Sequence, residues 1–351
     1  MKTKQRGFTI IELLITLAIS GTLIAGIGQI LLQSKQTYKT QQALSLMMED
    51  GRYILETLTK ETRRMGYLRN KTASPEGQEA VGGQEDLFVL DDGGDGSGAL
   101  GSGVTLKKGE YIHGDYNAYG FDGTPYNDNR LIFRYQLNDA CDLGDCADTS
   151  SATSPCTRDI GLYPGDDPTV DRHVVTVYLY VEFDPVLKTP VLYCEAKRDV
   201  VTQISLGQNP DGSTIDIWLA TTARTSAKKP LLSNVEKLLM LYGVDTPYFD
   251  VATDEDVYDN ATNFYRRADE VSIATDCGSE EDRITPTSCW KHITSIKLYA
   301  VLRSEETHMT QNDSSYQIDG QTVPADVPGD RRLYRVFSTT ITPRVSNASS
   351  T

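Results

Sequence analysis

Basic residues and histidines are scarce in this sequence of 351 residues, and both shortages argue against whole classes of function. The net charge is −15, and because the first 70 residues hold ten basic and five acidic residues, the rest carries −20. Such a body would be repelled by phosphate backbones, which disfavours nucleic-acid binding. No GxSxG, HExxH or Walker motif occurs, and the four histidines lack the spacing of a metal site or catalytic triad: His113, His173, His292 and His308. We therefore expect no enzyme and no nucleic-acid partner.

Cysteine is absent from the first 140 residues, and all six cysteines follow within the acidic part. An even number in this context is typical of an exported, disulfide-bearing domain, and the lack of CxxC pairs disfavours a zinc site. Six cysteines allow fifteen pairings, so the connectivity stays open. Local closure favours Cys277 with Cys289, and Cys194 with the 141–156 cluster. The disulfide candidates are Cys141, Cys146, Cys156, Cys194, Cys277 and Cys289.

Charge is almost absent from residues 8–32, FTIIELLITLAISGTLIAGIGQILL, in which Glu12 is the only charged residue. As a helix this run would be roughly 37 Å long, enough to cross a bilayer. Three basic residues within the leader, residues 1–7, predict a cytoplasmic N-terminus by the positive-inside rule. We therefore expect one membrane pass with the C-terminal body on the outer side.

Apolar residues continue to recur at three- and four-residue steps through residues 33–65, which predicts an amphipathic continuation of the same helix. Gly66 is the expected C-cap, so the predicted helix spans 8–66. Its apolar stripe consists of Leu44, Met47, Met48, Gly51, Ile54, Leu55, Leu58 and Met65. A small-residue stripe in the membrane half would allow close helix packing in lipid: Ala18, Gly21, Thr22, Ala25 and Gly28.

Glu12 is unusual because a carboxylate near the bilayer centre costs about 2.5–3.5 kcal/mol and normally has a partner. One interpretation is that it lies near the membrane surface and reaches the headgroups. However, the string Gly7-Phe8-Thr9-Ile10-Ile11-Glu12-Leu13 resembles the type IV prepilin cleavage motif. The resemblance implies cleavage after Gly7 by a membrane-embedded prepilin peptidase and N-methylation of Phe8. It also implies that Glu12 pairs with the Phe8 amine of a neighbouring subunit, so that the two charges offset each other in lipid.

The composition changes after Gly66 to Gly, Asp, Ser and Asn with short β-branched runs, which predict strands. We expect an α+β fold in which a sheet-rich, pilin-like body packs on the amphipathic half of the long helix. The predicted organisation is a leader at 1–7, a helix at 8–66 with its transmembrane segment at 8–32, and an exported body at 67–351. Strands are predicted at Leu131–Leu137, His173–Phe183, Val191–Ala196, Val235–Val244, His292–Arg303 and Leu333–Ile341, with polar stretches at 91–103, 138–170 and 245–270.

Several further blocks resemble the PilW-type minor pilins, from residue 1 to about 345, whereas residues 71–170 depart from that family. The blocks are Gln41-Gln42-Ala43-Leu44, Asp50-Gly51-Arg52-Tyr53, Thr62-Arg63-Arg64-Met65-Gly66-Tyr67, Val235-Glu236-Lys237-Leu238, Leu241-Tyr242-Gly243-Val244-Asp245, Trp290, Ile296-Lys297-Leu298, Leu302-Arg303-Ser304 and Arg331-Arg332-Leu333-Tyr334-Arg335-Val336-Phe337. The resemblance implies a low-abundance structural subunit of a Gram-negative type IV pilus, extracted from the inner membrane into the filament. Its implied partners are other minor pilins, the major pilin, the prepilin peptidase, the inner-membrane assembly platform and a tip adhesin.

The bulk of the body adds an expectation about position, because a large body is awkward in a closely stacked shaft. We expect the filament tip, a role in initiating assembly, and support of twitching motility or adhesion. One alternative is a type II secretion pseudopilin, which shares the N-terminus. A second is a signal-anchored periplasmic enzyme, which would need a cluster of titratable residues in a pocket.

Two loop motifs suggest ligands only weakly. Gly96-Ser97-Gly98-Ala99-Leu100-Gly101 satisfies G-x-G-x-x-G, but no helix start follows, so we expect no nucleotide site. Two acidic loops offer oxygen ligands for Ca²⁺ without EF-hand spacing, and we expect no other cofactor. The acidic residues are Asp91, Asp92 and Asp95 in one loop and Asp245, Asp250, Asp254, Asp256 and Asp259 in the other.

Overall fold

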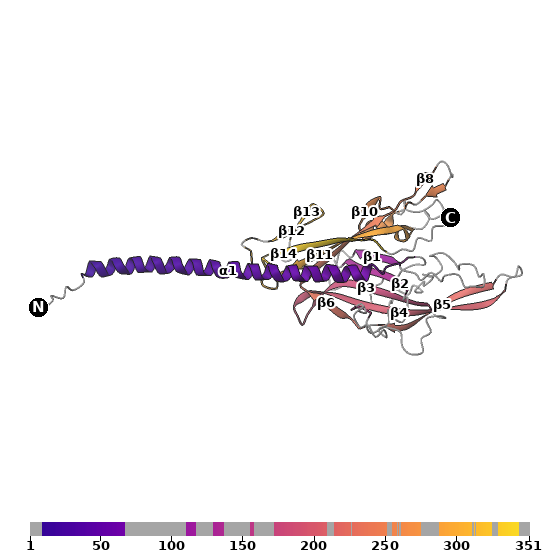
Figure 1. The fold of residues 1–351 in the computed structure, drawn as a ribbon, viewed down its shortest axis with the longest axis horizontal. Helices are drawn as coiled ribbons and strands as arrows, with labels where there is room; N and C mark the ends of the chain where they lie inside the picture. Colours follow the sequence, from indigo (N-terminus) through magenta and orange to yellow (C-terminus); the bar gives the residue numbers. More distant parts are fainter. Residues whose placement is uncertain are drawn as a thin grey trace.

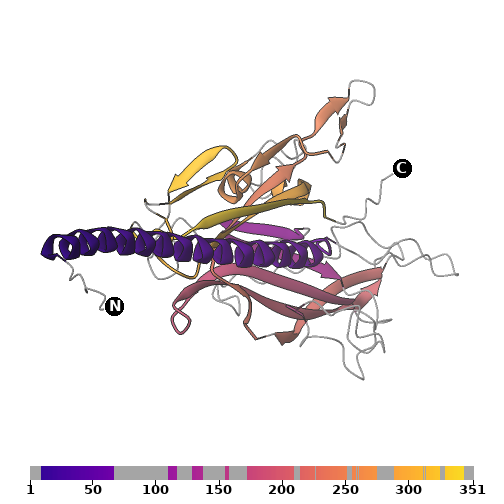
Figure 2. The same cartoon turned by 60° about the vertical axis from the view of Figure 1, so that its left-hand side comes forward.

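The computed structural model describes residues 9–66, 110–116, 129–136, 155–157, 172–208, 214–225, 227–250, 255–257, 259, 261–274, 288–310, 312, 314–324 and 329–343. Its dominant element is one long helix, α1 (Ile10–Thr62). The N-terminal half of α1 projects from the molecule and the C-terminal half lies against the body (Figures 1 and 2). The long helix and strand-rich body confirm the predicted α+β fold class.

Two antiparallel sheets form most of the body. In the first sheet, β1 to β5 pair in chain order, and β6 pairs with residues 191–194 of β4, ahead of the part of β4 that pairs with β5. The strands are β1 (Ile112–Tyr116), β2 (Asn129–Gln136), β3 (Arg172–Asp184), β4 (Thr189–Gln208), β5 (Thr214–Thr225) and β6 (Lys229–Ser233). The second sheet has the order β10-β7-β11-β14, with β7 (Val235–Val244), β10 (Phe264–Arg266), β11 (Ile293–Arg303) and β14 (Tyr334–Ile341). The strands of this second sheet all follow β6 in the chain and pair with one another, so the sheet-rich body contains two main sheets.

Short elements complete the described body. Two hairpins are formed by β8 (Tyr248–Asp250) with β9 (Glu255–Val257), and by β12 (Ser315–Ile318) with β13 (Gln321–Pro324). The helix α3 (Ala268–Ile273) and the 3₁₀ helix η3 (Ser288–His292) precede β11. The polar stretch at 245–270 thus contains three short strands that its composition did not predict.

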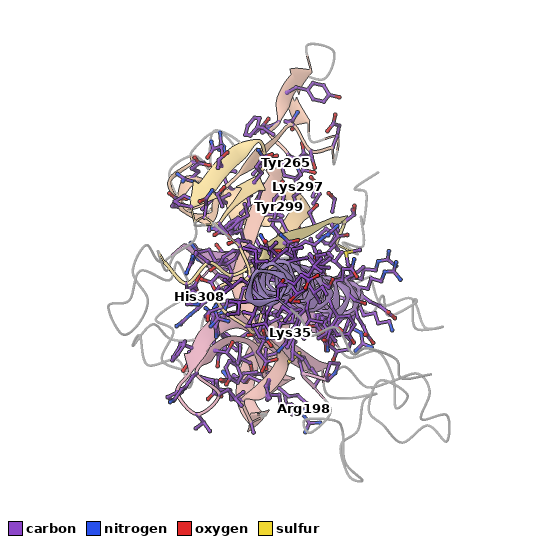
Figure 3. The ribbon with its side chains drawn as sticks, turned by 90° about the vertical axis from the view of Figure 1, so that its left-hand side faces the viewer. Lys35, Arg198, Tyr265, Lys297, Tyr299 and His308 are labelled. Carbon is purple, nitrogen blue, oxygen red and sulfur yellow. A yellow bond between two sulfur atoms is a disulfide. The ribbon has the colours of Figure 1, made fainter. Side chains whose placement is uncertain are left out.

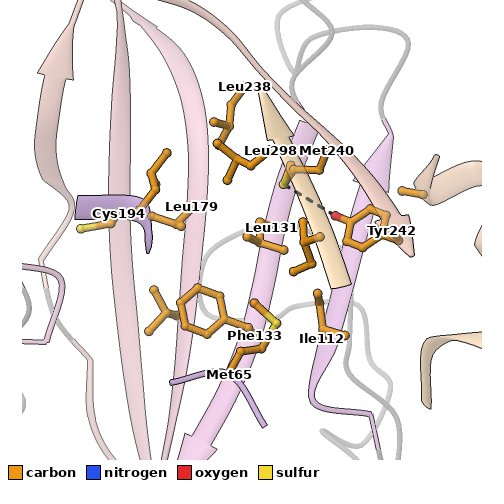
Figure 4. Close-up of a cluster of buried hydrophobic side chains, with 14 of the residues drawn as sticks. Met65, Ile112, Leu131, Phe133, Leu179, Cys194, Leu238, Met240, Tyr242 and Leu298 are labelled. Carbon is orange, nitrogen blue, oxygen red and sulfur yellow. Dashed lines mark hydrogen bonds between the residues drawn. The ribbon is translucent and has the colours of Figure 1, made fainter. Parts of the chain in front are cut away.

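The core lies between the two sheets and the C-terminal half of α1. Viewed along its axis, α1 lies between the second sheet above and the first sheet below (Figure 3). Leu131 and Phe133 of β2 meet Met240 and Tyr242 of β7 in this layer, and Leu298 of β11 joins them (Figure 4). All five are almost fully buried, so they supply the apolar burial that holds the sheets together.

Strand prediction was accurate where apolar or β-branched residues are dense. The predicted Val235–Val244 coincides with β7. Four of the other predicted strands begin and end within two residues of an observed strand, and the fifth does not. The predicted Val191–Ala196 is only part of β4, which runs for 20 residues because its second half pairs with β5. The polar composition of that second half concealed it.

The predicted amphipathic stripe faces the body, with Met47, Gly51, Ile54 and Leu58 buried. The helix ends at Thr62, earlier than expected, and a further turn leads to Gly66. Gly66 has a φ of 70°, in the left-handed region, and its N–H donates to the Arg134 carbonyl at 2.9 Å. Gly66 therefore ends the turn and ties it to β2, rather than capping α1 directly.

Gly51 permits the close approach of α1 to β14. A Cβ atom at this position would lie 2.2 Å from the Phe337 ring. We expect Gly51→Leu to destabilise the body by about 1–3 kcal/mol, although leucine favours helices, because the overpacked ring must move. Urea unfolding of the full chain in detergent would measure the loss.

The contact itself is tested by adding Phe337→Ala. If Gly51 and Phe337 share this space, the double variant loses less stability than the sum of the two single variants. Strictly additive losses would contradict the contact.

Candidate assembly site on the N-terminal helix

The projecting half of α1 exposes an unusual amount of apolar surface. Every isoleucine and leucine between Ile10 and Leu32 is more than half exposed, from 52% at Ile15 to 82% at Ile10. This stretch belongs to the one helix in the described residues that is long and apolar enough to span a membrane, with a mean hydropathy of 2.2 in its best window. Surface of this kind is stable in lipid or against other apolar helices, so the half-helix is a membrane anchor.

Thr9 and Glu12 form a capping box at the start of α1. The Thr9 hydroxyl accepts from the Glu12 backbone N–H at 3.4 Å, and the Glu12 carboxylate accepts from the Thr9 backbone N–H at 3.1 Å. The Thr9 hydroxyl also donates to the same carboxylate oxygen at 3.0 Å. Glu12 is thus held back along the helix towards its N-terminal end, where the positive end of the helix dipole favours a negative charge.

The predicted partner of Glu12, the Phe8 amine, is not among the described residues. Gly7 and Phe8 lie outside the described residues, so the cleavage position and its amine are not placed. Thr9, which directly follows Phe8, was missed as a functional residue at the sequence level. The T-x-x-E spacing of a capping box was the signal that would have revealed it.

The small-residue face of the membrane half is open. A Cβ atom at Gly21 or Gly28, the two glycines of this face, would meet nothing within 4 Å. The face therefore has no close packing partner among the described residues of this chain. It can approach other helices closely in lipid, as the sequence predicted.

An ion pair lies where α1 leaves the body. Lys39 contacts Glu306 at 2.8 Å across a small cavity of about 200 Å³, between α1 and the loop after β11. Asp50 lines the same cavity, where burial and the neighbouring Glu49 raise the pKa of its carboxyl group. Both partners of the ion pair are about half exposed, so the apolar stripe and not this pair holds α1 to the body.

The C-terminal end of α1 is buried in the body more deeply than the region around Lys39. Glu61 and Thr62 are almost fully buried, and the Thr62 hydroxyl donates to the Leu58 carbonyl at 2.6 Å. Burial, with the neighbouring Glu61 carboxylate, raises the pKa of Tyr135 to about 12, so its hydroxyl stays neutral. The inner end of α1 is therefore packed within the body, whereas its outer half is exposed.

One disulfide joins the cysteine cluster to β4. Cys156 is bonded to Cys194, with a Cα–Cα distance of 5.5 Å, and both residues are buried. Cys194 therefore pairs with the 141–156 cluster, as expected. Cys289 is also disulfide-bonded, while Cys141, Cys146 and Cys277 lie outside the described residues.

The other residues considered for chemistry do not converge. His113 stacks on Trp290 at 4.5 Å, whereas His308 is exposed beside Thr307. Asp245 is buried, and Asp259 is exposed and accepts from the Ala261 N–H. The described residues contain no group of three or more His, Cys, Asp or Glu able to hold a metal ion. Both the G-x-G-x-x-G string and the acidic loop at 91–95 fall outside the described residues.

Two protein-family models match the chain. Residues 189–344 match type IV pilus-assembly protein W (PilW), a range that includes every strand from β4 to β14. Residues 2–28 match the prokaryotic N-terminal methylation motif, which contains Gly7, Phe8 and Glu12. No curated protein and no solved structure matches the chain. The two matches cover the N-terminal segment and the second half of the chain, and they leave residues 29–188 outside both.

Proposed function

We propose that this chain, a type IV pilin of the PilW type, is a minor pilin that helps initiate pilus assembly and is located at the filament tip. The observation that carries the proposal is the division of α1 into an exposed apolar half and a half buried on a large body. PilW proteins are structural pilus components, which supports a role in assembly and not in catalysis.

The proposed pathway begins with a chain anchored in the inner membrane with its N-terminus in the cytoplasm. Prepilin peptidase removes residues 1–7 and methylates the Phe8 amine. The assembly platform then extracts the chain, so that the exposed face of α1 exchanges lipid for the helices of other minor pilins and the major pilin. Apolar surface remains covered throughout this exchange, and Glu12 gains the Phe8 amine of its neighbour as a partner.

Glu12 provides a direct test of that pairing. Glu12→Gln keeps an acceptor for the Thr9 N–H but removes the charge, so we expect normal membrane insertion with incorporation into sheared pili reduced by at least about a hundredfold. The estimate follows because an unpaired buried ammonium group costs roughly 3–5 kcal/mol. Quantitative immunoblots of membranes and sheared filaments would measure the ratio.

The matched control is Thr9→Ala, which removes the hydroxyl cap and keeps the carboxylate. We expect this variant to be incorporated at close to the wild-type level. Wild-type incorporation of Glu12→Gln would show that the cap, and not charge pairing, is the function of Glu12.

The size of the body supports the tip position. Residues 67–351 have an expected radius of gyration of about 19 Å, and the two sheets lie on opposite sides of α1 (Figure 3). Pilin subunits stack through their helices, so a body this wide would collide with axial neighbours in a shaft. The first subunit extracted ends up farthest out, which links the tip position to initiation.

Deletion and labelling test this position. We expect deletion to reduce surface pili sharply, and gold-labelled protein to lie at filament ends in few copies while labelled major pilin follows the shaft. Uniform labelling of the shaft would refute the tip position. Normal piliation with lost secretion in the deletion strain would favour the alternative, a type II secretion pseudopilin with the same N-terminus. Support of twitching motility and an adhesin partner are parts of the same proposal.

A further inference from the structure

A pocket of about 610 Å³ lies on the side of the second sheet that faces away from α1. Its volume falls within the range of small-molecule sites. The lining comes from β7, β10, the start of α3, β11 and the β12–β13 hairpin: Lys237, Leu239, Met240, Leu241, Tyr242, Tyr265, Arg267, Ala268, Glu270, Tyr299, Tyr316, Ile318, Asp319, Gln321 and Val323. The assembly proposal does not use this pocket, and only Met240, Tyr242 and Ala268 of its lining belong to the hydrophobic core.

The hairpin is held over the sheet by its turn. Asp319 and Gly320, between the paired residues Ile318 and Gln321, have φ values of 50° and 80°, as in a type I′ turn. The Asp319 carboxylate accepts from the Lys297 ammonium group at 3.1 Å and from the Tyr299 hydroxyl at 3.3 Å. These contacts lower the pKa of Asp319, so the bridge between hairpin and sheet is charged at neutral pH.

Tyrosines form the walls around this bridge. Lys297 lies 5.7 Å from the ring centre of Tyr265 and 5.6 Å from that of Tyr299, and the three side chains gather on one side of the molecule (Figure 3). Tyr265 is 40% exposed, whereas Tyr299 and Tyr316 are 5% exposed. Tyr265 therefore offers a ring to a ligand, while the other two are packed into the walls.

The charges of the walls are already paired. Lys297 is paired with Asp319, and Arg267 lies 3.3 Å from Asp269 and 3.4 Å from Glu270. Lys237 is also engaged within the chain. A charged ligand would have to compete with these pairs, and an anion would in addition meet a strongly acidic body.

Hydroxyl groups suit such walls because each one both donates to a carboxylate and accepts from an ammonium or amide group without breaking a pair. The C–H faces of sugar rings pack on tyrosine rings, which combine an apolar face with a polar edge. We propose that this pocket binds a neutral oligosaccharide, with a sugar ring stacked on Tyr265 and hydroxyl groups bonded to Asp319 and Gln321. The proposal is independent of the role in pilus assembly.

The test uses the full chain in a zwitterionic detergent without a sugar headgroup, since a maltoside would compete. Maltotriose, cellotriose, laminaritriose and tri-N-acetylchitotriose are the neutral probes, with trigalacturonate and the glucosamine trimer as charged ones. Saturation-transfer NMR detects binding and calorimetry gives Kd. We expect at least one neutral trimer to bind more tightly than both charged trimers. The proposal would be overturned if none of the four neutral trimers binds, or if a charged trimer binds more tightly than every neutral one.

Variants then locate the site. Tyr265→Ala should weaken binding of the best neutral trimer roughly tenfold. Tyr248→Ala removes a tyrosine that is 53% exposed on β8, outside the pocket lining, and should leave Kd unchanged. Gln321→Ala, at an exposed hairpin position, is a second pocket variant in case Tyr265→Ala does not fold. Wild-type affinity in the folded pocket variants would place the sugar elsewhere.

Discussion

Replacing Gly7 with tryptophan should leave the chain at full length, with residues 1–7 still attached and no N-methylated phenylalanine. The expected reason is steric, because the peptidase of the prepilin motif must fit the backbone closely at the residue before the cut. An uncleaved leader keeps three basic residues on the cytoplasmic side, which opposes extraction into a filament. The effect should therefore be close to all or none. Mass spectrometry of the purified chain measures it directly.

The matched control is Gly26→Trp, at a position where a Cβ atom meets nothing within 4 Å. This variant should still be processed between Gly7 and Phe8, whatever its effect on helix packing in the filament. A wild-type N-terminus that begins after Leu32 would instead indicate an ordinary secretory signal and remove the prepilin interpretation. Normal processing of Gly7→Trp would remove the role assigned to Gly7.

Loss of the Cys156–Cys194 disulfide should be the largest effect of a local change on the stability of the body. The bond closes a loop with a sequence separation of 38, and loops of this size typically contribute about 2–4 kcal/mol. Both sulfur atoms are buried, so their replacement also leaves imperfect packing. We expect the double variant Cys156→Ser, Cys194→Ser to melt several degrees below the wild type in calorimetry under oxidising conditions.

Reduction separates the disulfide from simple packing loss. Wild-type chain treated with a strong reductant should approach the melting temperature of the double variant treated in the same way, and the reductant should lower the melting temperature of the double variant less than that of the wild type. The remaining response of the double variant would come from its other disulfide bonding, which includes the bond at Cys289. An unchanged melting temperature in the double variant would show that the bond contributes little to the folded state.

The oligosaccharide pocket and the N-terminal helix lie on different parts of the molecule, so their failures are distinguishable. A chain that assembles normally but binds no neutral trimer would retain the pilin function and lose the pocket proposal. A wild-type chain that binds a neutral trimer but never enters a filament would retain the pocket proposal and lose the pilin function. Gly7→Trp is expected to block processing and leaves the pocket residues unchanged, so this variant should bind the neutral trimers with wild-type affinity.

Local patterns in the sequence were sufficient for the elements that depend on neighbouring residues. The apolar run at 8–32 and the stripe through Met47, Gly51, Ile54 and Leu58 predicted α1 because helix periodicity is a property of adjacent turns. Dense β-branched and aromatic residues predicted β3 and β11, and an apolar run predicted β7, because these patterns also lie within a few adjacent residues. The string from Gly7 to Glu12 identified the methylation motif that the family comparison confirms.

Only the tertiary structure decided what depends on residues far apart in the chain. Whether the strands form one sheet or two is set by long-range pairing. β5 and the β12–β13 hairpin mix apolar with polar residues and β10 has only three residues, so their sequences did not predict them as strands. The choice of Cys156 from the cysteine cluster follows from its position beside β4, and Gly51 is needed because Phe337, nearly 300 residues later, packs on it. The pocket arises because an Asp-Gly turn places Asp319 over Lys297 and Tyr299. Contacts of this kind depend on packing and strand pairing between residues far apart in the chain. A local window of sequence does not contain both partners of such a contact.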